Sequence, residues 1–259
     1  MGKTVLITGA SSGIGMELAK LFAYDGYNLV LIARRRMQLE KLAFELTNKY
    51  SVKITIITKD LSQPESPDEI FKELKDKSIQ IDILVNCAGT QIYGEFQKKD
   101  IEKELQLIQI NIVSLTQLTK LAMEGMLKRG SGKILNIGST GSFAPAPLNA
   151  IYCATKAYVL NFSEGIAKDL EGTGISVTTL CPGATRTEFA EKAKMQNTRM
   201  FNLSVMSAEK VAQIGYKALF RGKRVKVAGM LNKLIVFSTR LIPRGLVLKT
   251  GKILMSSKG

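Results

Sequence analysis

The sequence predicts an α/β fold, a doubly wound parallel sheet of about seven strands with helices on both faces and a basic amphipathic C-terminal extension. Short β-type runs alternate with longer helical stretches from the start almost to the end. The 259 residues, 45% hydrophobic and 23% charged, suit one large domain or two small ones. No internal repeat or long linker interrupts the pattern. We therefore expect one domain, with its core in residues 1–190 and with a cover over the site, the last helix and strand, and the basic tail in residues 191–259.

Each strand is expected where a short run rich in β-branched and other apolar residues occurs. The strands are Thr4–Thr8, Asn28–Ala33, Lys53–Thr58, Ile81–Asn86, Lys133–Ile137, Ile175–Leu180 and Val225–Ala228. Helical periodicity fills the intervals. The helices are Gly15–Tyr24, Arg36–Lys49, Glu65–Lys77, Ile101–Lys128, Ile151–Leu170 and Ala208–Phe220. Open parallel sheets bind ligands outside the carboxyl ends of their strands, so the chemistry is expected there.

The composition excludes several classes of site. The sequence contains no histidine, and its cysteines, Cys87, Cys153 and Cys181, form no Cys-x-x-Cys pair. A disulfide framework, a zinc finger, a histidine-based triad and a metal site are therefore not expected. The first apolar run is short and ends in Gly9, unlike a signal peptide. A reducing, cytoplasmic setting is the default expectation.

The net charge of +15 is concentrated near the C-terminus. Residues 192–259 contain 15 of the 37 Lys and Arg residues but only one of the 22 acids, Glu209. Within this tail, residues 227–255 interleave apolar and basic side chains. Such a segment can lie on an anionic membrane surface, attract an acidic substrate, carrier or partner, or cover the core with its apolar side. These interpretations stay open; no run is suited to span a bilayer, and no nucleic-acid partner is expected.

A glycine-rich turn joins the first expected strand to the first helix. Residues 8–15 read Thr-Gly-Ala-Ser-Ser-Gly-Ile-Gly. Glycines let the chain turn sharply and bring backbone N–H groups and a helix N-terminus against a phosphate. The turn therefore predicts a dinucleotide-binding site of the Rossmann type. Its cofactor-binding residues are Gly9, Ser11, Ser12, Gly13, Ile14 and Gly15.

The residues after the second expected strand indicate which dinucleotide binds. NAD-binding folds carry an acid near this position that holds the ribose hydroxyls. Here Ala33 is followed by Arg34, Arg35 and Arg36. A guanidinium forms paired hydrogen bonds with a 2′-phosphate, which a carboxylate would repel. We therefore expect NADPH, with Arg34 as the main ligand and Arg35 as its helper; the alternative is an arginine cluster that is only solvated.

A tyrosine and a lysine one helical turn apart predict proton-transfer chemistry. Tyr152 and Lys156 stand at i and i+4 in an expected helix, and Ser139 lies upstream at the end of the fifth strand. A nearby ammonium favours the phenolate, so Lys156 is expected to lower the pKa of Tyr152. Many helices contain Tyr-x-x-x-Lys, and the glycine turn and the upstream serine make this one specific.

These motifs, in this order over about residues 3–190, resemble the short-chain dehydrogenase/reductase family. The resemblance implies that Tyr152 is the catalytic acid/base, that Lys156 also holds the nicotinamide ribose, and that Ser139 hydrogen-bonds the substrate carbonyl. Asn111 matches the family's asparagine that keeps a water in the proton relay. The remaining implied cofactor contacts are Asp60, Leu61, Asn86, Ala88, Gly89, Pro182, Gly183, Thr187 and, less favoured, Thr185.

The resemblance also implies hydride transfer between a nicotinamide and a carbonyl carbon. We expect an NADPH-dependent reductase that converts a ketone or aldehyde to an alcohol; the alternative is a dinucleotide-binding regulatory or scaffold protein without turnover. Apolar residues near the mouth suit an apolar or acyl-chain substrate such as a 3-oxoacyl thioester. They are Phe143, Ala144, Pro145, Leu148, Phe189, Met195, Met200, Phe201 and Met206. A homodimer or homotetramer is implied, with the apolar helix Ile101–Lys128 against a second subunit.

Overall fold

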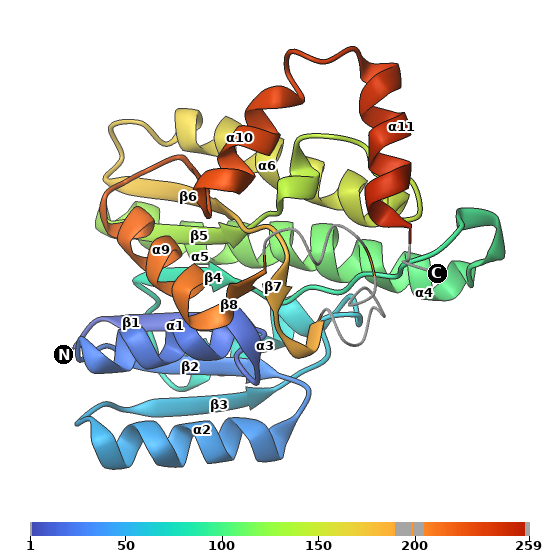
Figure 1. Ribbon diagram of the computed structural model, residues 1–259. Helices are drawn as coiled ribbons and strands as arrows, with labels where there is room; N and C mark the ends of the chain where they lie inside the picture. Colours follow the sequence, from blue (N-terminus) through green and yellow to red (C-terminus); the bar gives the residue numbers. More distant parts are fainter. Residues whose placement is uncertain (1, 190–197, 199–204, 257–259) are drawn as a thin grey trace.

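A parallel sheet forms the centre of the computed structural model, which describes residues 2–189, 198 and 205–256. Within that part of the chain its seven strands have the order β3-β2-β1-β4-β5-β6-β9 (Figure 1). They are β1 (Thr4–Thr8), β2 (Asn28–Ala33), β3 (Ile54–Thr58), β4 (Ile83–Asn86), β5 (Gly132–Ile137), β6 (Ile175–Cys181) and β9 (Val225–Val227). Strands β2 and β3 are added on one side of β1, and the chain then crosses to its other side to form β4. The position between β1 and β4 is the switch point where such sheets bind ligands. The predicted fold class is confirmed.

Helices cover both faces of the sheet. They are α1 (Gly13–Tyr24), α2 (Arg36–Lys49), α3 (Ser66–Asp76), α4 (Ile101–Ile108), α5 (Leu115–Arg129), α6 (Ala150–Asp169), α9 (Ala208–Phe220), α10 (Met230–Ser238) and α11 (Arg244–Met255). The described residues also form shorter elements: 3-10 turns η1 (Phe96–Lys98) and η3 (Thr140–Ser142), π-helical η2 (Gln109–Ser114), and the two-stranded sheet of β7 (Thr185–Arg186) and β8 (Met206–Ser207).

Strand side chains alternate between two apolar clusters. Val5 and Ile7 of β1 pack with Phe22 of α1 and Leu219 of α9 on one face. Leu6, between them in the chain, packs on the other face with residues of α3 and α5. Because both faces of the sheet are covered, most strand residues are apolar, as expected for a parallel sheet between helices, with buried polar exceptions such as Asn136 and Thr178.

The seven expected strands differ from the observed ones by at most two residues at either end. The expected helix Ile101–Lys128 is instead interrupted by η2, a π-helical segment that widens the helix for one turn. Such segments are frequent at functional sites. The last part of the tail forms α10 and α11, and no helix of the described residues is long and apolar enough to cross a membrane.

We call residues 229–256 the C-terminal arm. Figure 1 shows it at the top of the molecule, with the C-terminal end of α11 directed toward the loop before α6. Asn232, Val236 and Met255 are buried, whereas most of α11 is exposed. The arm therefore covers the core only through these few buried residues. Most of its apolar side chains are exposed.

We expect Gly15→Ala to destabilise the protein. A Cβ atom at Gly15 would lie 2.4 Å from the carbonyl oxygen of Gly9, so α1 would have to move away from the turn. Overpacking of this kind costs about 1–3 kcal/mol in the free energy of unfolding, which urea denaturation measures. The control is Gly165→Ala at an exposed position of α6, where a Cβ meets nothing within 4 Å and should stabilise the protein. Equal effects of the two substitutions would contradict the tight approach at Gly15.

Candidate active site

A cavity of about 530 Å³ lies at the carboxyl ends of the strands and runs from the β1–α1 turn to the start of α6. Most of the residues predicted from the sequence line it. They are Gly9, Ser11, Ser12, Gly13, Ile14, Arg34, Arg35, Asp60, Leu61, Ala88, Gly89, Ser139, Tyr152, Lys156, Pro182, Gly183, Thr185 and Thr187. Gly15, Asn86 and Asn111 are outside this lining, and their positions are described below.

Backbone geometry shapes the turn at one end of the cavity. Gly9 and Gly13 have φ values of 67° and 56°, in the left-handed region that favours glycine. A Cβ atom at Gly9 would lie 2.9 Å from the backbone of Ala88. The hydroxyl of Thr8 accepts hydrogen bonds from the N–H groups of Cys87 and Ala88, each at 3.0 Å. The ends of β1 and β4 are thereby held together, and Gly15 contributes by letting α1 start against Gly9.

Ser139 is fixed at the end of β5 by a small capping motif. Its hydroxyl oxygen accepts the N–H of Gly141 at 3.0 Å, and the hydroxyl of Ser142 accepts the N–H of Ser139 at 3.2 Å. The N–H of Thr140 donates to the carbonyl of Pro182 at 2.8 Å, which ties this turn to the end of β6. The Ser139 side chain is therefore held in place before any substrate arrives.

Tyr152 and Lys156 meet Ser139 at this end of the cavity. Both belong to the first turns of α6, and the Lys156 Nζ atom lies 5.8 Å from the centroid of the Tyr152 ring. Nζ also donates to the backbone carbonyl of Ile137 at 2.8 Å, and only 5% of Lys156 is exposed. The structure therefore brings the three predicted side chains together.

Burial controls the ionisation of this pair. It raises the pKa of Tyr152 above its usual value of 10, while a hydrogen bond with the Ser139 side chain acts in the opposite direction. Burial also lowers the pKa of Lys156 to about 8. The prediction that Lys156 lowers the pKa of the phenol is thus contradicted, because desolvation penalises the charged form of each group. The phenol keeps its proton and is available as a proton donor.

Asn111 lies in η2 behind the cavity wall. Its amide oxygen accepts the N–H of Thr90 at 3.0 Å, and its amide nitrogen donates to the carbonyl of Thr90 at 3.0 Å and to the hydroxyl of Thr155 at 3.1 Å. Thr155 directly precedes Lys156 in α6. Asn111 therefore joins the segment after β4 to the helix that carries the tyrosine and the lysine, and its buried amide is satisfied.

Asn86 is directed away from the cavity. Its amide nitrogen donates to the Asn136 side chain at 2.9 Å and to the Thr119 hydroxyl at 3.0 Å, and Asn136 donates to the Ser163 hydroxyl at 2.9 Å. These buried groups connect β4, β5, α5 and α6. In the structure Asn86 thus stabilises the sheet beneath the site and does not line the cavity, although the family resemblance implied a cofactor contact for it.

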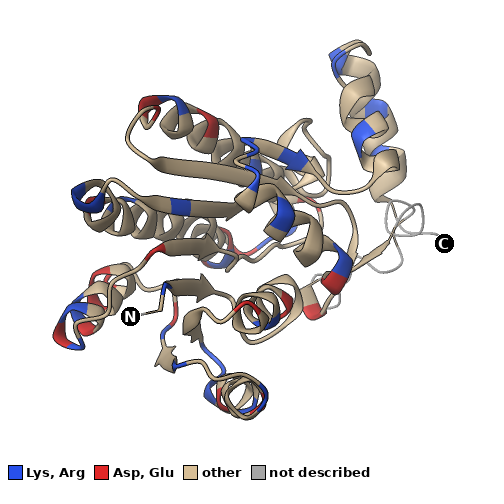
Figure 2. Ribbon diagram, turned by 90° about the vertical axis from the view of Figure 1, so that its left-hand side faces the viewer, with Lys and Arg blue, Asp and Glu red and all other residues tan. Residues whose placement is uncertain are grey.

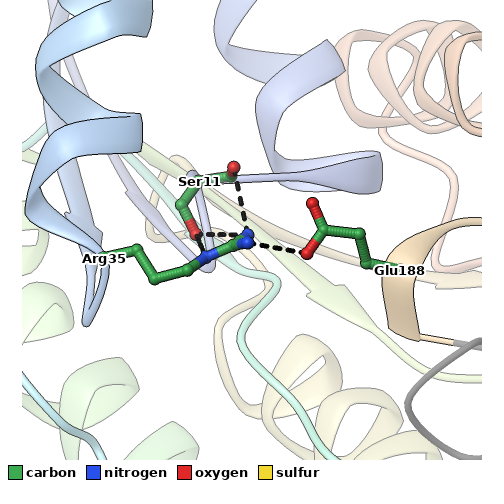
Figure 3. Close-up of polar contacts among 3 residues, drawn as sticks. All are labelled: Ser11, Arg35 and Glu188. Carbon is green, nitrogen blue, oxygen red and sulfur yellow. Dashed lines mark hydrogen bonds and ion pairs between the residues drawn. The ribbon is translucent and has the colours of Figure 1, made fainter.

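The arginines at the end of β2 have different positions. Arg35 donates to the Ser11 hydroxyl and carbonyl at 3.2–3.3 Å and to Glu188 at 2.7 Å (Figure 3). Arg34 lies 3.6 Å from the carboxylate of Asp60, and its side chain is 66% exposed. The sequence suggested Arg34 as the main ligand, but Arg35 is the arginine that is held on the glycine-rich turn. The sequence offered no signal for Glu188.

Apolar side chains also line the cavity, in addition to the polar residues of the Tyr152 end. The Phe189 ring lies 6.0 Å from the Tyr152 ring, and Ala146 and Met255 also line the cavity. Met255 belongs to α11, and its carbonyl accepts a hydrogen bond from the Tyr93 hydroxyl. Sequence reasoning missed Met255, which is brought to the site by the fold alone.

Of the nine residues expected at the mouth, Phe189 lines the cavity, whereas five described ones do not: Phe143, Ala144, Pro145, Leu148 and Met206. Met195, Met200 and Phe201 lie outside the described residues.

Comparison with known proteins identifies the family. A model of the short chain dehydrogenases matches residues 3–198. The chain belongs to the short-chain dehydrogenase/reductase family. It is 30% identical over 257 residues to the very-long-chain 3-oxoacyl-CoA reductase of Rattus norvegicus, which covers 96% of this chain and 78% of that protein.

Two solved structures of the family are similar over nearly the whole chain. A short-chain dehydrogenase from Sphingobium yanoikuyae in complex with NADPH has a TM-score of 0.83 and 34% identity, and the match covers 94% of each chain. The bulky-bulky ketone specific alcohol dehydrogenase from Comamonas testosteroni has a TM-score of 0.78 and 32% identity, with 92% of this chain and 93% of that one covered. The protein is accordingly an oxidoreductase of a family that uses nicotinamide dinucleotides.

The residues present fit such a cofactor. Glycines at positions 9 and 13 leave the turn without side chains where a pyrophosphate would lie against backbone N–H groups and the start of α1. A Cβ atom at Gly13 would lie 3.1 Å from Thr187, so the segment after β6 closes over the same turn. Together these elements form a cradle that a larger residue at either glycine would fill.

We expect Lys156→Met to change the pH dependence of stability. Because burial lowers the pKa of Lys156 to about 8 from its ordinary 10.5, the native state binds fewer protons than the unfolded state between these values, and stability rises with pH across that window. Below pH 8 the cost of the buried charge is fully present. The variant should therefore be more stable than wild type at pH 7, on the order of 2 kcal/mol, and the difference should shrink toward pH 10 in urea titrations. A difference independent of pH would contradict the shift.

Proposed function

We propose that this protein reduces a ketone or aldehyde carbonyl to an alcohol with NADPH. The observation that carries the proposal is the position of Tyr152, Ser139 and Lys156 at one end of a single cavity whose other end is the glycine-rich turn. A cavity with a phosphate-binding turn at one end and proton-transfer groups at the other suits a ligand that is anchored by phosphates and reacts at its far end.

The side chains would act on the carbonyl oxygen of the substrate. Negative charge develops there during reduction, and donors that are fixed beforehand stabilise it most effectively. Ser139, held by its capping turn, would donate one hydrogen bond, and Tyr152 would donate its proton as general acid. Lys156, fixed by the Ile137 carbonyl, lies under the Tyr152 ring and would stabilise negative charge left on the phenol. The bound nicotinamide would supply the hydride.

NADPH rather than NADH is favoured by charge at the end of β2. Arg35 is held on Ser11 of the turn, Arg34 lies beside it in the chain, and no acid stands between Ala33 and Glu40. A 2′-phosphate would meet guanidinium groups here, and the acid that binds ribose hydroxyls directly after the second strand of NAD-binding folds is replaced by arginine. The NADPH complex of the Sphingobium yanoikuyae relative supports the same choice.

The substrate would be apolar. Phe189, Ala146 and Met255 line the cavity beside Tyr152, and methionine adapts to ligands of varied shape. The names of two relatives agree with this character, since one is a very-long-chain 3-oxoacyl-CoA reductase and the other a bulky-bulky ketone specific alcohol dehydrogenase. We infer an acyl chain or a similarly extended group next to the carbonyl, as in a 3-oxoacyl thioester.

We also infer a homo-oligomer, as is common in the family. Ile101 and Leu105 of α4, Val113 of η2 and Leu127 of α5 are large apolar side chains exposed along one continuous helical stretch. Their burial against a second copy would supply the apolar contact that stable subunit interfaces need.

The C-terminal arm is suited to an anionic membrane surface. Leu234, Phe237 and Leu241 are exposed by 59–71%, and Leu246 and Ile253 of α11 are also exposed. The arm carries five Lys or Arg residues and no acid, and Figure 2 shows α11 projecting at the edge of the molecule with basic but no acidic positions. Apolar side chains that insert and cations that attract phosphates are the two parts of peripheral membrane binding. A second copy of this chain, itself net positive, complements the arm less well.

We expect Tyr152→Phe to slow ketone-dependent oxidation of NADPH by ~10²–10⁴-fold, because the proton donor is lost. The assay uses ketones of increasing chain length with NADPH and with NADH, and the wild type should prefer NADPH. Fluorescence titration should show that the variant still binds the cofactor. The control is Tyr24→Phe, an exposed tyrosine at the end of α1. Equal rates for wild type and Tyr152→Phe would refute the assigned acid, and cofactor binding without turnover in the wild type would favour the regulatory alternative.

We expect the protein to co-sediment with phosphatidylserine vesicles at low salt and to be released at high salt, and not to bind phosphatidylcholine vesicles. Leu234→Ser combined with Phe237→Ser should weaken this binding. Met37→Ser combined with Phe44→Ser, which changes exposed apolar residues on α2, should not. Absence of binding at low salt would contradict membrane docking, and a loss of subunit association in the Leu234/Phe237 variant would assign the arm to a second copy.

A further inference from the structure

Arg35 is shared between the phosphate-binding turn and the segment after β6. Its Nε and Nη2 atoms lie 3.3 and 3.2 Å from the Ser11 hydroxyl, Nη2 lies 3.3 Å from the Ser11 carbonyl, and Nη1 lies 2.7 Å from a carboxylate oxygen of Glu188. All three residues line the cavity, and Figure 3 shows the contacts among them. The contact joins positions 153 residues apart in the chain.

Glu188 is held close to the turn by its neighbours. Thr187, directly before it, lies 3.1 Å from where a Cβ atom at Gly13 would stand. Phe189, directly after it, packs near the Tyr152 ring. The Glu188 side chain is 43% exposed, and neighbours on both sides of it hold its backbone beside Arg35.

A carboxylate and a phosphate compete for the same guanidinium edges. Both accept short, charge-assisted hydrogen bonds from paired N–H groups, and they repel each other. A phosphate at Arg35 and Ser11 would thus meet an anion of the protein itself. The three consecutive arginines each have such a carboxylate: Arg34 has Asp60 at 3.6 Å, Arg36 has Glu40 at 2.7 Å on its own helix, and Arg35 has Glu188.

We propose that Glu188 is an internal competitor for the 2′-phosphate site: it occupies Arg35 until a 2′-phosphorylated ligand displaces it, and so sets how tightly such ligands bind. The proposal rests on the proposed binding of NADPH at Arg35. Glu188 is then a residue that tunes cofactor affinity without contacting the reacting atoms, because each binding event must break its ion pair.

Binding of two nucleotide fragments separates this role from general effects. 2′,5′-ADP carries the 2′-phosphate and 5′-AMP lacks it, and isothermal titration calorimetry measures both without turnover. We expect Glu188→Gln to bind 2′,5′-ADP three- to tenfold more tightly, roughly the value of a partly exposed ion pair plus the relieved repulsion, and to bind 5′-AMP as the wild type does. Glu40→Gln, which removes the same charge from the pair with Arg36, should change neither affinity more than about twofold.

A double-mutant cycle tests whether the effect passes through Arg35. In an Arg35→Gln background, Glu188→Gln should no longer tighten 2′,5′-ADP binding. Unchanged or weaker 2′,5′-ADP binding by Glu188→Gln, equal tightening of both fragments, or a tightening that persists without Arg35 would each overturn the role of Glu188. If the wild type shows no preference for 2′,5′-ADP over 5′-AMP, the NADPH proposal itself fails, and this result is distinct from the others.

Discussion

The burial of one ammonium group is the constraint on which the reactive end of this protein depends. Lys156 is 5% exposed, and its Nζ atom donates to the carbonyl of Ile137 at the end of β5. A Cβ atom at Gly89 would lie 3.6 Å from Nζ and 3.4 Å from the Asn111 side chain, so the backbone at Gly89 closes one side of the space around the ammonium group. Burying a cation is unfavourable, and the sheet, η2 and α6 together hold it there. The unfavourable buried charge lies where the chemistry is expected, as is common at functional sites.

Most of the fold could be predicted from the sequence because its signals are local. The strands and the helices Arg36–Lys49 and Ala208–Phe220 follow from apolar periodicity, and the two-sided burial of the sheet makes that pattern strong. The π-helical turn at Gln109–Ser114 could not be predicted, because the apolar pattern there is that of an ordinary helix. Its Asn111 hydrogen-bonds Thr90 and Thr155, and neither partner is close to it in the chain.

The candidate site could be predicted in its members but not in its electrostatics. Spacing alone brings Tyr152 and Lys156 to one helical face, and it suggests that the cation acidifies the phenol. Burial reverses the direction of that shift, and burial is a property of the assembled layers. Likewise, nothing near Arg34 and Arg35 in the sequence indicates which of them contacts the turn. The ion-pair partner of Arg35, Glu188, lies 153 residues later in the chain. Met255 reaches the cavity by the same kind of long-range packing.

Three consecutive residues, Thr187, Glu188 and Phe189, contact the glycine-rich turn, Arg35 and the Tyr152 ring in succession. This tripeptide therefore connects the glycine-rich end of the cavity to the end that contains Tyr152. A point substitution would disturb one of the three contacts, whereas losing or gaining a single residue would shift all of them out of phase at once. Surface connections usually tolerate changes of length well. An insertion or deletion within these three residues would instead displace side chains that line the binding pocket.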